Sequence, residues 1–215
     1  MKKLALVTAL ILSSLLATTA QAESQFVNPA TTGSIATARL DFTIVIPQVL
    51  FLRVGTSSGN TATDTTINGI TYTVPGANVG DASVITGVGG DLTAGAVTVR
   101  VYGNGGNISL NSTTTGPLNS GTVGEDIPWS QISVASAALA ASTVGFTNAA
   151  ITHPAFNTAA AGGLGTATTL TATAKVVRLE GKWTYTYLNA NAVAAGTYGG
   201  TVAKNGRVTY TATQL

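Results

Sequence analysis

The sequence predicts an all-β fold, a single-domain Ig-like or Greek-key β-sandwich of mostly antiparallel strands. Short runs rich in Val, Ile, Thr and Tyr recur at intervals of about ten residues, and clusters of Gly, Asn, Ser and Pro separate them. No tandem repeat of fixed period is present, so a solenoid is not expected. Cys is absent, and charged residues make up only 8% of the chain. Thiol catalysis and disulfides are therefore excluded, and the composition favours a dense, assembled extracellular protein.

Residues 1–22 have the layout of a cleaved signal peptide. Lys2 and Lys3 precede an apolar run over residues 4–16, which is too short to span a bilayer, and Ala-Gln-Ala ends the segment. We expect cleavage after Ala22 and export from a Gram-negative cell to the periplasm, and then to the cell surface or the extracellular space. No second segment resembles a transmembrane helix. Without Lys2 and Lys3, basic and acidic residues are equal in number, so we expect no nucleic-acid binding.

Residues 23–37 are polar and irregular, and they predict an extended N-terminal arm before a sandwich domain over 38–215. Leu40, Phe42, Ile44 and Ile46 alternate with Arg39, Asp41, Thr43 and Val45, which is the period of a half-buried strand, and Pro47 breaks or bends that run. Residues 49–54 then form a second strand or continue the first one into the opposite sheet. The alternation fits an ordinary first strand, and it fits equally a strand inserted in trans into another subunit. This candidate intersubunit strand has its apolar face at Ala36, Ala38, Leu40, Phe42 and Ile44.

Further strands are predicted where apolar or β-branched residues alternate between turn sequences. The Ala-rich stretch 133–165 lacks such alternation, and its fold is not predicted beyond a helical turn or two over 134–142. The predicted strands cover residues 69–74, 82–86, 96–103, 107–113, 167–181 and 182–190.

Residues 196–215 predict a hairpin at the end of the chain. Asn205 and Gly206 fit the two central positions of a type I′ turn, both of which require positive φ. The final strand would then pair with the residues just before the turn. Upstream, Tyr198 follows a small-residue turn and is a candidate for a tyrosine corner, in which the hydroxyl bonds to upstream backbone. A strand tyrosine that packs on its neighbours is the equal alternative.

We expect no catalytic site, no cofactor and no metal. His153 is the only histidine, and the Gly-x-Ser-x-Gly spelling around Ser57 lacks the helical periodicity that a nucleophile elbow needs after the serine. The 8 carboxylates are scattered, and the adjacent pair Glu125 and Asp126 favours a turn over a glycosidase site. No metal-, phosphate- or dinucleotide-binding motif is present. The chain is therefore not expected to be an enzyme.

Three large aromatic residues, Trp183, Tyr185 and Tyr187, share one face of a predicted strand. The core of a sandwich is the favoured place for such a stripe. The alternative is a glycan-stacking platform on the surface, which would make the protein a monomeric secreted adhesin or carbohydrate-binding β-sandwich.

Both ends of the chain resemble bacterial fimbrial subunits of the chaperone–usher type, in particular the cysteine-free, archaic or spore-coat-U-like branch. The resemblance rests on the signal peptide, on the arm and strand GSIATARLDFTIVIP and on the ending AGTYGGTVAKNGRVTYTATQL. It implies a pilin-like, non-enzymatic structural subunit that self-associates by strand exchange into a fimbria or biofilm matrix and serves cell adhesion. It also implies a periplasmic chaperone and an outer-membrane usher as partners.

The chain also departs from the pilin pattern. It has no disulfide, and position 214 is Gln where pilins tend to have Tyr, while Tyr210 lies further in. The expected hairpin would in addition pair the last strand within its own chain. We therefore expect the intersubunit strand at the other end of the protein, over residues 33–46.

Overall fold

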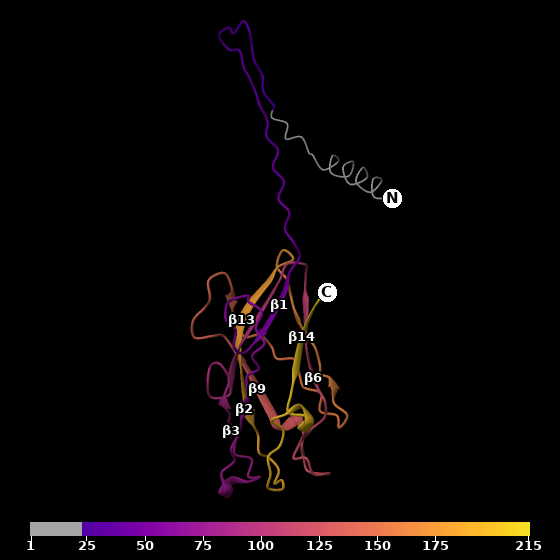
Figure 1. Ribbon diagram of the computed structural model, residues 1–215. Helices are drawn as coiled ribbons and strands as arrows, with labels where there is room; N and C mark the ends of the chain where they lie inside the picture. Colours follow the sequence, from indigo (N-terminus) through magenta and orange to yellow (C-terminus); the bar gives the residue numbers. More distant parts are fainter. Residues whose placement is uncertain (1–22) are drawn as a thin grey trace, which may run out of the picture. The chain divides into compact units, whose positions relative to one another are not determined.

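Figure 1 shows the computed structural model, which describes residues 23–215 as two units, 23–47 and 48–215. The signal-peptide prediction concerns residues 1–22, which lie outside the described part. The larger unit confirms the all-β prediction, since its elements are strands and three short 3-10 turns, Gly76–Asn78, Trp129–Gln131 and Val202–Lys204. Among the described residues no helix has the length and apolar character needed to cross a bilayer.

The first sheet is centred on β13 (Val177–Tyr187), which is 11 residues long. β5 (Ala96–Gly103) pairs with one edge of β13, and β1 (Leu50–Val54) pairs with β5 and ends the sheet on that side. β9 (Ile132–Ala137) pairs with the other edge of β13. Two short strands complete this sheet: β3 (Ile85–Thr86), antiparallel to β13, and β10 (Thr147–Asn148), parallel to it.

The second sheet is centred on β6 (Ile108–Thr114). The last strand of the chain, β14 (Thr209–Gln214), runs antiparallel beside β6 (Figure 1). The other edge of β6 pairs with β12 (Thr168–Leu170) and β11 (Gly163–Leu164). Two small ladders lie outside these sheets: β2 (Ile70–Thr71) with β4 (Val88–Gly89), and β7 (Leu118–Asn119) with β8 (Asp126–Ile127).

The hydrophobic core is built from the facing sides of the two sheets. β6 alternates strictly between buried and half-buried residues, and its Ile108 and Leu110 are fully buried. Val99 and Val101 of β5 are also fully buried and belong to the same cluster. The period-two pattern of the sequence thus appears as alternating burial, which is how a strand with one core-facing side is expected to behave.

The N-terminal unit differs from the prediction for residues 38–46. No residue between 23 and 47 belongs to a β-ladder, so the arm extends beyond Thr37 to Pro47. The start of the unit is held to its middle by two exposed contacts: the Arg39 guanidinium donates to the Glu23 carboxylate at 2.6 and 2.9 Å, and the Thr37 amide donates to Gln25 at 3.0 Å.

The helical turn predicted over residues 134–142 is wrong. Residues Ile132–Ala137 form β9, whose six residues all pair with β13. Alanine has a low intrinsic strand propensity, but a ready partner strand outweighs that preference because strand formation depends strongly on tertiary context.

The predicted C-terminal hairpin is also wrong. Val202–Lys204 form a 3-10 turn that ends at Asn205, where φ is 56°, and Gly206 is not among the residues with positive φ. A type I′ turn needs positive φ at both positions. The Asn205 amide instead donates to the Pro117 carbonyl at 3.0 Å, and its oxygen accepts from the Thr115 hydroxyl at 3.1 Å. The last strand is thereby directed to β6 and not to the residues that precede the turn.

The hydrogen bond expected of a tyrosine corner is present, although Tyr198 lies in the connection ahead of β14 and also packs against the core. The Tyr198 hydroxyl donates to the carbonyl oxygen of Ala194 at 2.8 Å, four residues upstream, in the long connection between β13 and β14. In Ig-like sandwiches this bond lies at the corner that leads into the sixth strand.

Candidate functional site

The strand order of the sandwich leaves one position vacant. A seven-stranded Ig sandwich has strands A, B, E and D in one sheet and C, F and G in the other. Here β1, β5, β13 and β9 have the order A-B-E-D, and β6 and β14 correspond to C and F. Within residues 23–215, β14 forms a ladder with β6 alone, so the place of strand G beside it is unfilled. We call β1 and β14 together the open seam.

The two strands of the open seam lie side by side without a ladder between them. They meet at one end, where the side-chain amides of Gln48 and Gln214 are hydrogen-bonded at 3.0 Å. The start of β1 therefore lies next to the end of β14, and the two strands run in opposite directions.

β14 presents an uncharged edge. Its sequence TYTATQ alternates between half-buried Tyr210, Ala212 and Gln214 and exposed threonines. Soluble sandwiches usually protect an exposed edge with lysine, proline or a bulge, because free backbone donors and acceptors would otherwise pair with another strand. β14 has none of these three features, so its own side chains do not protect its outer edge.

Tyr210 fixes β14 to the first sheet. Its hydroxyl lies 2.8 Å from the hydroxyl of Tyr185 on β13 and 2.7 Å from Nε2 of His153. The Tyr210 ring also packs against Trp183, with ring centroids 5.0 Å apart. Burial raises the pKa of Tyr210 well above its ordinary value and lowers the pKa of His153 to about 4. At neutral pH both groups are therefore uncharged, and their hydrogen bonds link the two sheets without burying a charge.

β1 forms the other side of the open seam. Leu52 and Val54 pack against the core from this edge strand without being fully covered. A cleft of about 300 Å³ lies along β1, and Asp64 and Thr66 are among the other residues that line it. On the outer side the Arg53 guanidinium donates to the Gly55 carbonyl at 2.6 Å and to Asp91 at 3.3 Å.

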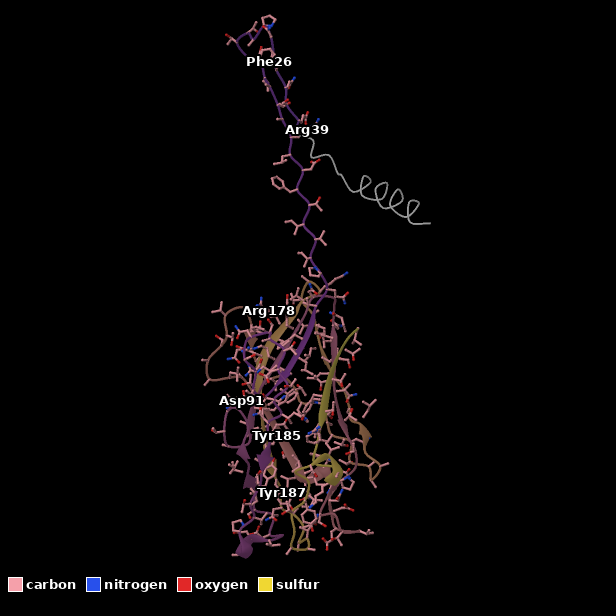
Figure 2. All side chains as sticks on the ribbon, viewed as in Figure 1. Phe26, Arg39, Asp91, Arg178, Tyr185 and Tyr187 are labelled. Atoms are coloured by element: carbon pink, nitrogen blue, oxygen red, sulfur yellow. The ribbon has the colours of Figure 1, made fainter. Side chains whose placement is uncertain are left out.

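The predicted intersubunit residues lie on the arm and are all exposed. Ala36 and Ala38 are exposed, and Leu40, Phe42 and Ile44 are 71%, 83% and 84% exposed. Figure 2 shows the backbone of this stretch as extended, with side chains projecting to alternate sides. The arm is thus a preformed strand-like segment with an apolar face and without a ladder partner among residues 23–215.

The glycan-stacking alternative is wrong for the residues that it named. Trp183, Tyr185 and Tyr187 are 0%, 7% and 6% exposed and belong to the core. The indole N–H of Trp183 donates to the Ile151 carbonyl at 2.7 Å inside the protein. Sugar stacking needs an accessible aromatic face, which these rings lack.

The residues considered for hydrolase chemistry have other partners. The Ser57 hydroxyl donates to the Gly59 carbonyl at 3.0 Å within a polar loop, while His153 contacts Tyr210. The Glu125 carboxylate accepts from the Ser120 hydroxyl at 2.6 Å between β7 and β8, whereas Asp126, predicted to share that turn, is the first residue of β8. No cluster of three metal-ligating side chains occurs among the described residues.

Sequence reasoning missed one polar cluster on the outer face of the first sheet. Arg100 and Glu180 are both buried there, with the Arg100 guanidinium 2.7 Å from the Glu180 carboxylate. The Phe146 ring lies under two guanidinium groups, those of Arg100 at 4.7 Å and Arg178 at 4.9 Å. Charged residues at alternate positions of β13, Arg178, Glu180 and Lys182, were the available signal, but they also fit a solvent-exposed strand face.

Comparisons with protein-family models, with curated proteins and with solved structures give no match for this chain. The resemblance to fimbrial subunits therefore stays a prediction from the sequence, and the functional argument depends on the open seam and the arm.

Proposed function

We propose that the protein is a non-enzymatic structural subunit that polymerises by strand exchange. The apolar face of residues 36–46 of one copy adds to the open edge of β14 in another copy and supplies the missing seventh strand. The observation that carries this proposal is that, within residues 23–215, β14 forms a ladder on one edge only, while residues 36–46 of the same chain form no ladder.

Three properties of the two elements support their pairing. The apolar alternation of the arm has the period of a strand with one core-facing side, and β14 presents the same period through Tyr210 and Ala212. The arm is longer than the six residues of β14, so it can pair along the whole edge. Neither paired segment brings a net charge, because residues 36–46 carry one residue of each sign, Arg39 and Asp41, and β14 carries none.

The energetic gain comes from apolar burial and from main-chain hydrogen bonds. Burying a side chain of the size of Leu, Ile or Phe stabilises a complex by about 1.5–3 kcal/mol before ordering costs. Leu40, Phe42 and Ile44 are nearly fully exposed in the free arm, so each has most of this gain still available. Addition of an extended segment to a sheet edge is an established mode of recognition.

Export through a cleaved signal peptide, assembly at the cell surface and help from a periplasmic chaperone and an outer-membrane usher belong to the same proposal. They follow from the sequence of residues 1–22 and from the resemblance to fimbrial subunits. An exposed strand edge is prone to unspecific pairing, which is a physical reason for a helper protein that covers it before assembly.

Negative-stain electron microscopy of the purified mature chain, residues 23–215, tests the proposal. We expect filaments for the unmodified chain and for Thr43→Asp, and monomers for Phe42→Asp. Thr43 is the matched control because it lies on the polar side of the same strand. A synthetic peptide of residues 36–46 should shorten the filaments, and the same peptide with Asp in place of Phe42 should not. Filaments of equal length for Phe42→Asp and Thr43→Asp, or a monomeric unmodified chain, would contradict strand exchange.

A further inference from the structure

We infer that Pro47 is a specificity determinant that keeps the arm from adding to the seam of its own domain. This inference rests on the proposed function. The arm and the acceptor edge belong to one chain, so self-addition would compete with polymerisation.

The competition would be severe without a block. A short connection gives an intramolecular partner an effective concentration on the order of millimolar, so at about 1 µM subunit the arm of the same chain would be favoured by about 1,000-fold. Polymerisation therefore requires that the joint, the connection of Pro47 and Gln48 between arm and domain, prevents the arm from folding back onto β14 of its own domain.

The structure leaves a short joint. Val49 is already part of the domain, since its N–H donates to the Asn104 side-chain oxygen at 2.8 Å and its carbonyl accepts from the Asn104 amide at 3.4 Å. The candidate strand ends at Ile46, so only Pro47 and Gln48 connect it to the domain. The start of β1 also marks one end of the open seam, through the contact between Gln48 and Gln214. To enter its own seam, the arm would have to reverse direction at this joint and run antiparallel to β1.

A two-residue reversal is excluded by the geometry of proline. In tight hairpins a type I′ turn requires positive φ at both central residues, and a type II′ turn requires it at the first. Pro47 would occupy the first position, and its ring locks φ near −65°.

Three-residue reversals are disfavoured as well. A loop of residues 46–48 would start with Ile46 in the right-handed helical region, which the following proline disfavours on steric grounds. A loop of residues 47–49 would end with Val49 in the left-handed region, where a β-branched residue is an outlier. That loop would also break both bonds between Val49 and Asn104. The joint therefore favours an extended path, which leaves the arm accessible to a second copy.

A turn that permits reversal tests this inference. Replacement of Pro47 and Gln48 together by Asn and Gly supplies the preferred pair for a type I′ turn. Gln48→Gly alone, with Pro47 retained, is the matched control. We expect the double variant to form at least 10-fold less filament than the unmodified chain at equal concentration, and the control to assemble normally.

Disulfide trapping shows whether the arm pairs with β14 of its own chain or with β14 of another copy. The native chain has no cysteine that would interfere. Each of three variants carries one cysteine at Thr43 and a second at Thr209, Thr211 or Thr213. Together the three variants cover the possible registers of the arm against β14. With Pro47 present, we expect links between chains that appear as a ladder on a non-reducing gel. With Asn-Gly, we expect a link within one chain, seen as a faster-migrating monomer.

The outcomes separate the two proposals. Equal ladders and equal filaments with and without Pro47 would overturn the role of this residue and leave strand exchange intact. An intrachain link in the chain that retains Pro47 would also overturn its role. A chain without filaments or ladders that gains the intrachain link only with Asn-Gly would support the block at Pro47 and contradict polymerisation.

Discussion

The hydroxyl groups of Tyr185 and Tyr210 lie 2.8 Å apart and join β13 of one sheet to β14 of the other. Tyr210 reaches further, to Nε2 of His153 at 2.7 Å, so one side chain of the last strand contacts two polar partners inside the sandwich. β14 is paired on one edge only, and this polar contact across the layers therefore holds the open side of the strand in place.

Replacing Tyr210 by Phe should lower the stability of the domain. The ring still fits, but the Tyr185 hydroxyl and His153 each lose a buried partner. We expect a loss of about 1–3 kcal/mol in the free energy of unfolding, measured by urea denaturation. Thr211→Ala, on the exposed side of the same strand, should change that free energy by less than about 0.5 kcal/mol. Equal effects of the two substitutions would show that the polar contact does not stabilise β14.

His153 should make the domain less stable in acid. Burial lowers its pKa to about 4 in the folded protein, against about 6.5 in an unfolded chain. Between these values the unfolded chain binds more protons, so stability is lost as the pH falls through this window, by up to about 3 kcal/mol. Urea denaturation at pH 7, 5.5 and 4 should give a shallower decline for His153→Gln. A decline identical to that of the unmodified protein would mean that other groups cause it.

Replacing Glu180 alone by a neutral residue should lower the stability of the domain. Glu180→Gln leaves the Arg100 guanidinium buried without its countercharge, and breaking such a pair costs about 3–5 kcal/mol. A combined Arg100→Met and Glu180→Leu variant should recover much of that loss, because it removes both charges. Glu23→Gln, at the exposed pair with Arg39, should leave the unfolding midpoint unchanged. Thermal and urea unfolding of the three variants check this order, and a mild effect of Glu180→Gln would contradict it.

Gly165 should be intolerant of any side chain. A Cβ at this position would overlap the carbonyl oxygen of Ala155 and lie 2.7 Å from the Ser112 hydroxyl. Because backbone atoms must move to accommodate it, we expect Gly165→Ala to cost about 1–3 kcal/mol in urea denaturation. Gly69→Ala is the control, since a Cβ there has no atom within 4 Å and φ is ordinary. Similar stabilities of the two variants would show that the chain relaxes around residue 165.

Elements with a strong local pattern were predictable from the sequence. The strand predicted over 96–103 is β5, and the one predicted over 107–113 is β6 within one residue, because alternating apolar residues between glycine-rich turns determine both. The Tyr198 bond was predictable for the same reason, since it connects residues only four positions apart.

Features that depend on distant pairing were not predictable. Asn205 and Gly206 carry a local hairpin signal, but the partner of β14 is β6, far upstream in the chain. Arg100 and Glu180 are 80 residues apart, so no local pattern shows that they meet or that loops bury them. The arm illustrates the same limit, since its alternation indicates a strand without indicating its partner.

The uncharged edge of β14 has a consequence for the behaviour of the protein in salt. Electrostatic steering accelerates association when the two partners carry opposite charge, and ionic strength screens it. TYTATQ has no charged side chain, and residues 36–46 of the arm carry one residue of each sign, Arg39 and Asp41. If the chain polymerises by the proposed strand exchange, the rate of filament growth, followed by light scattering, should therefore differ little between about 0.05 and 0.5 M NaCl. Under the proposed strand exchange, two such surfaces would suit assembly in surroundings whose salinity the cell does not control.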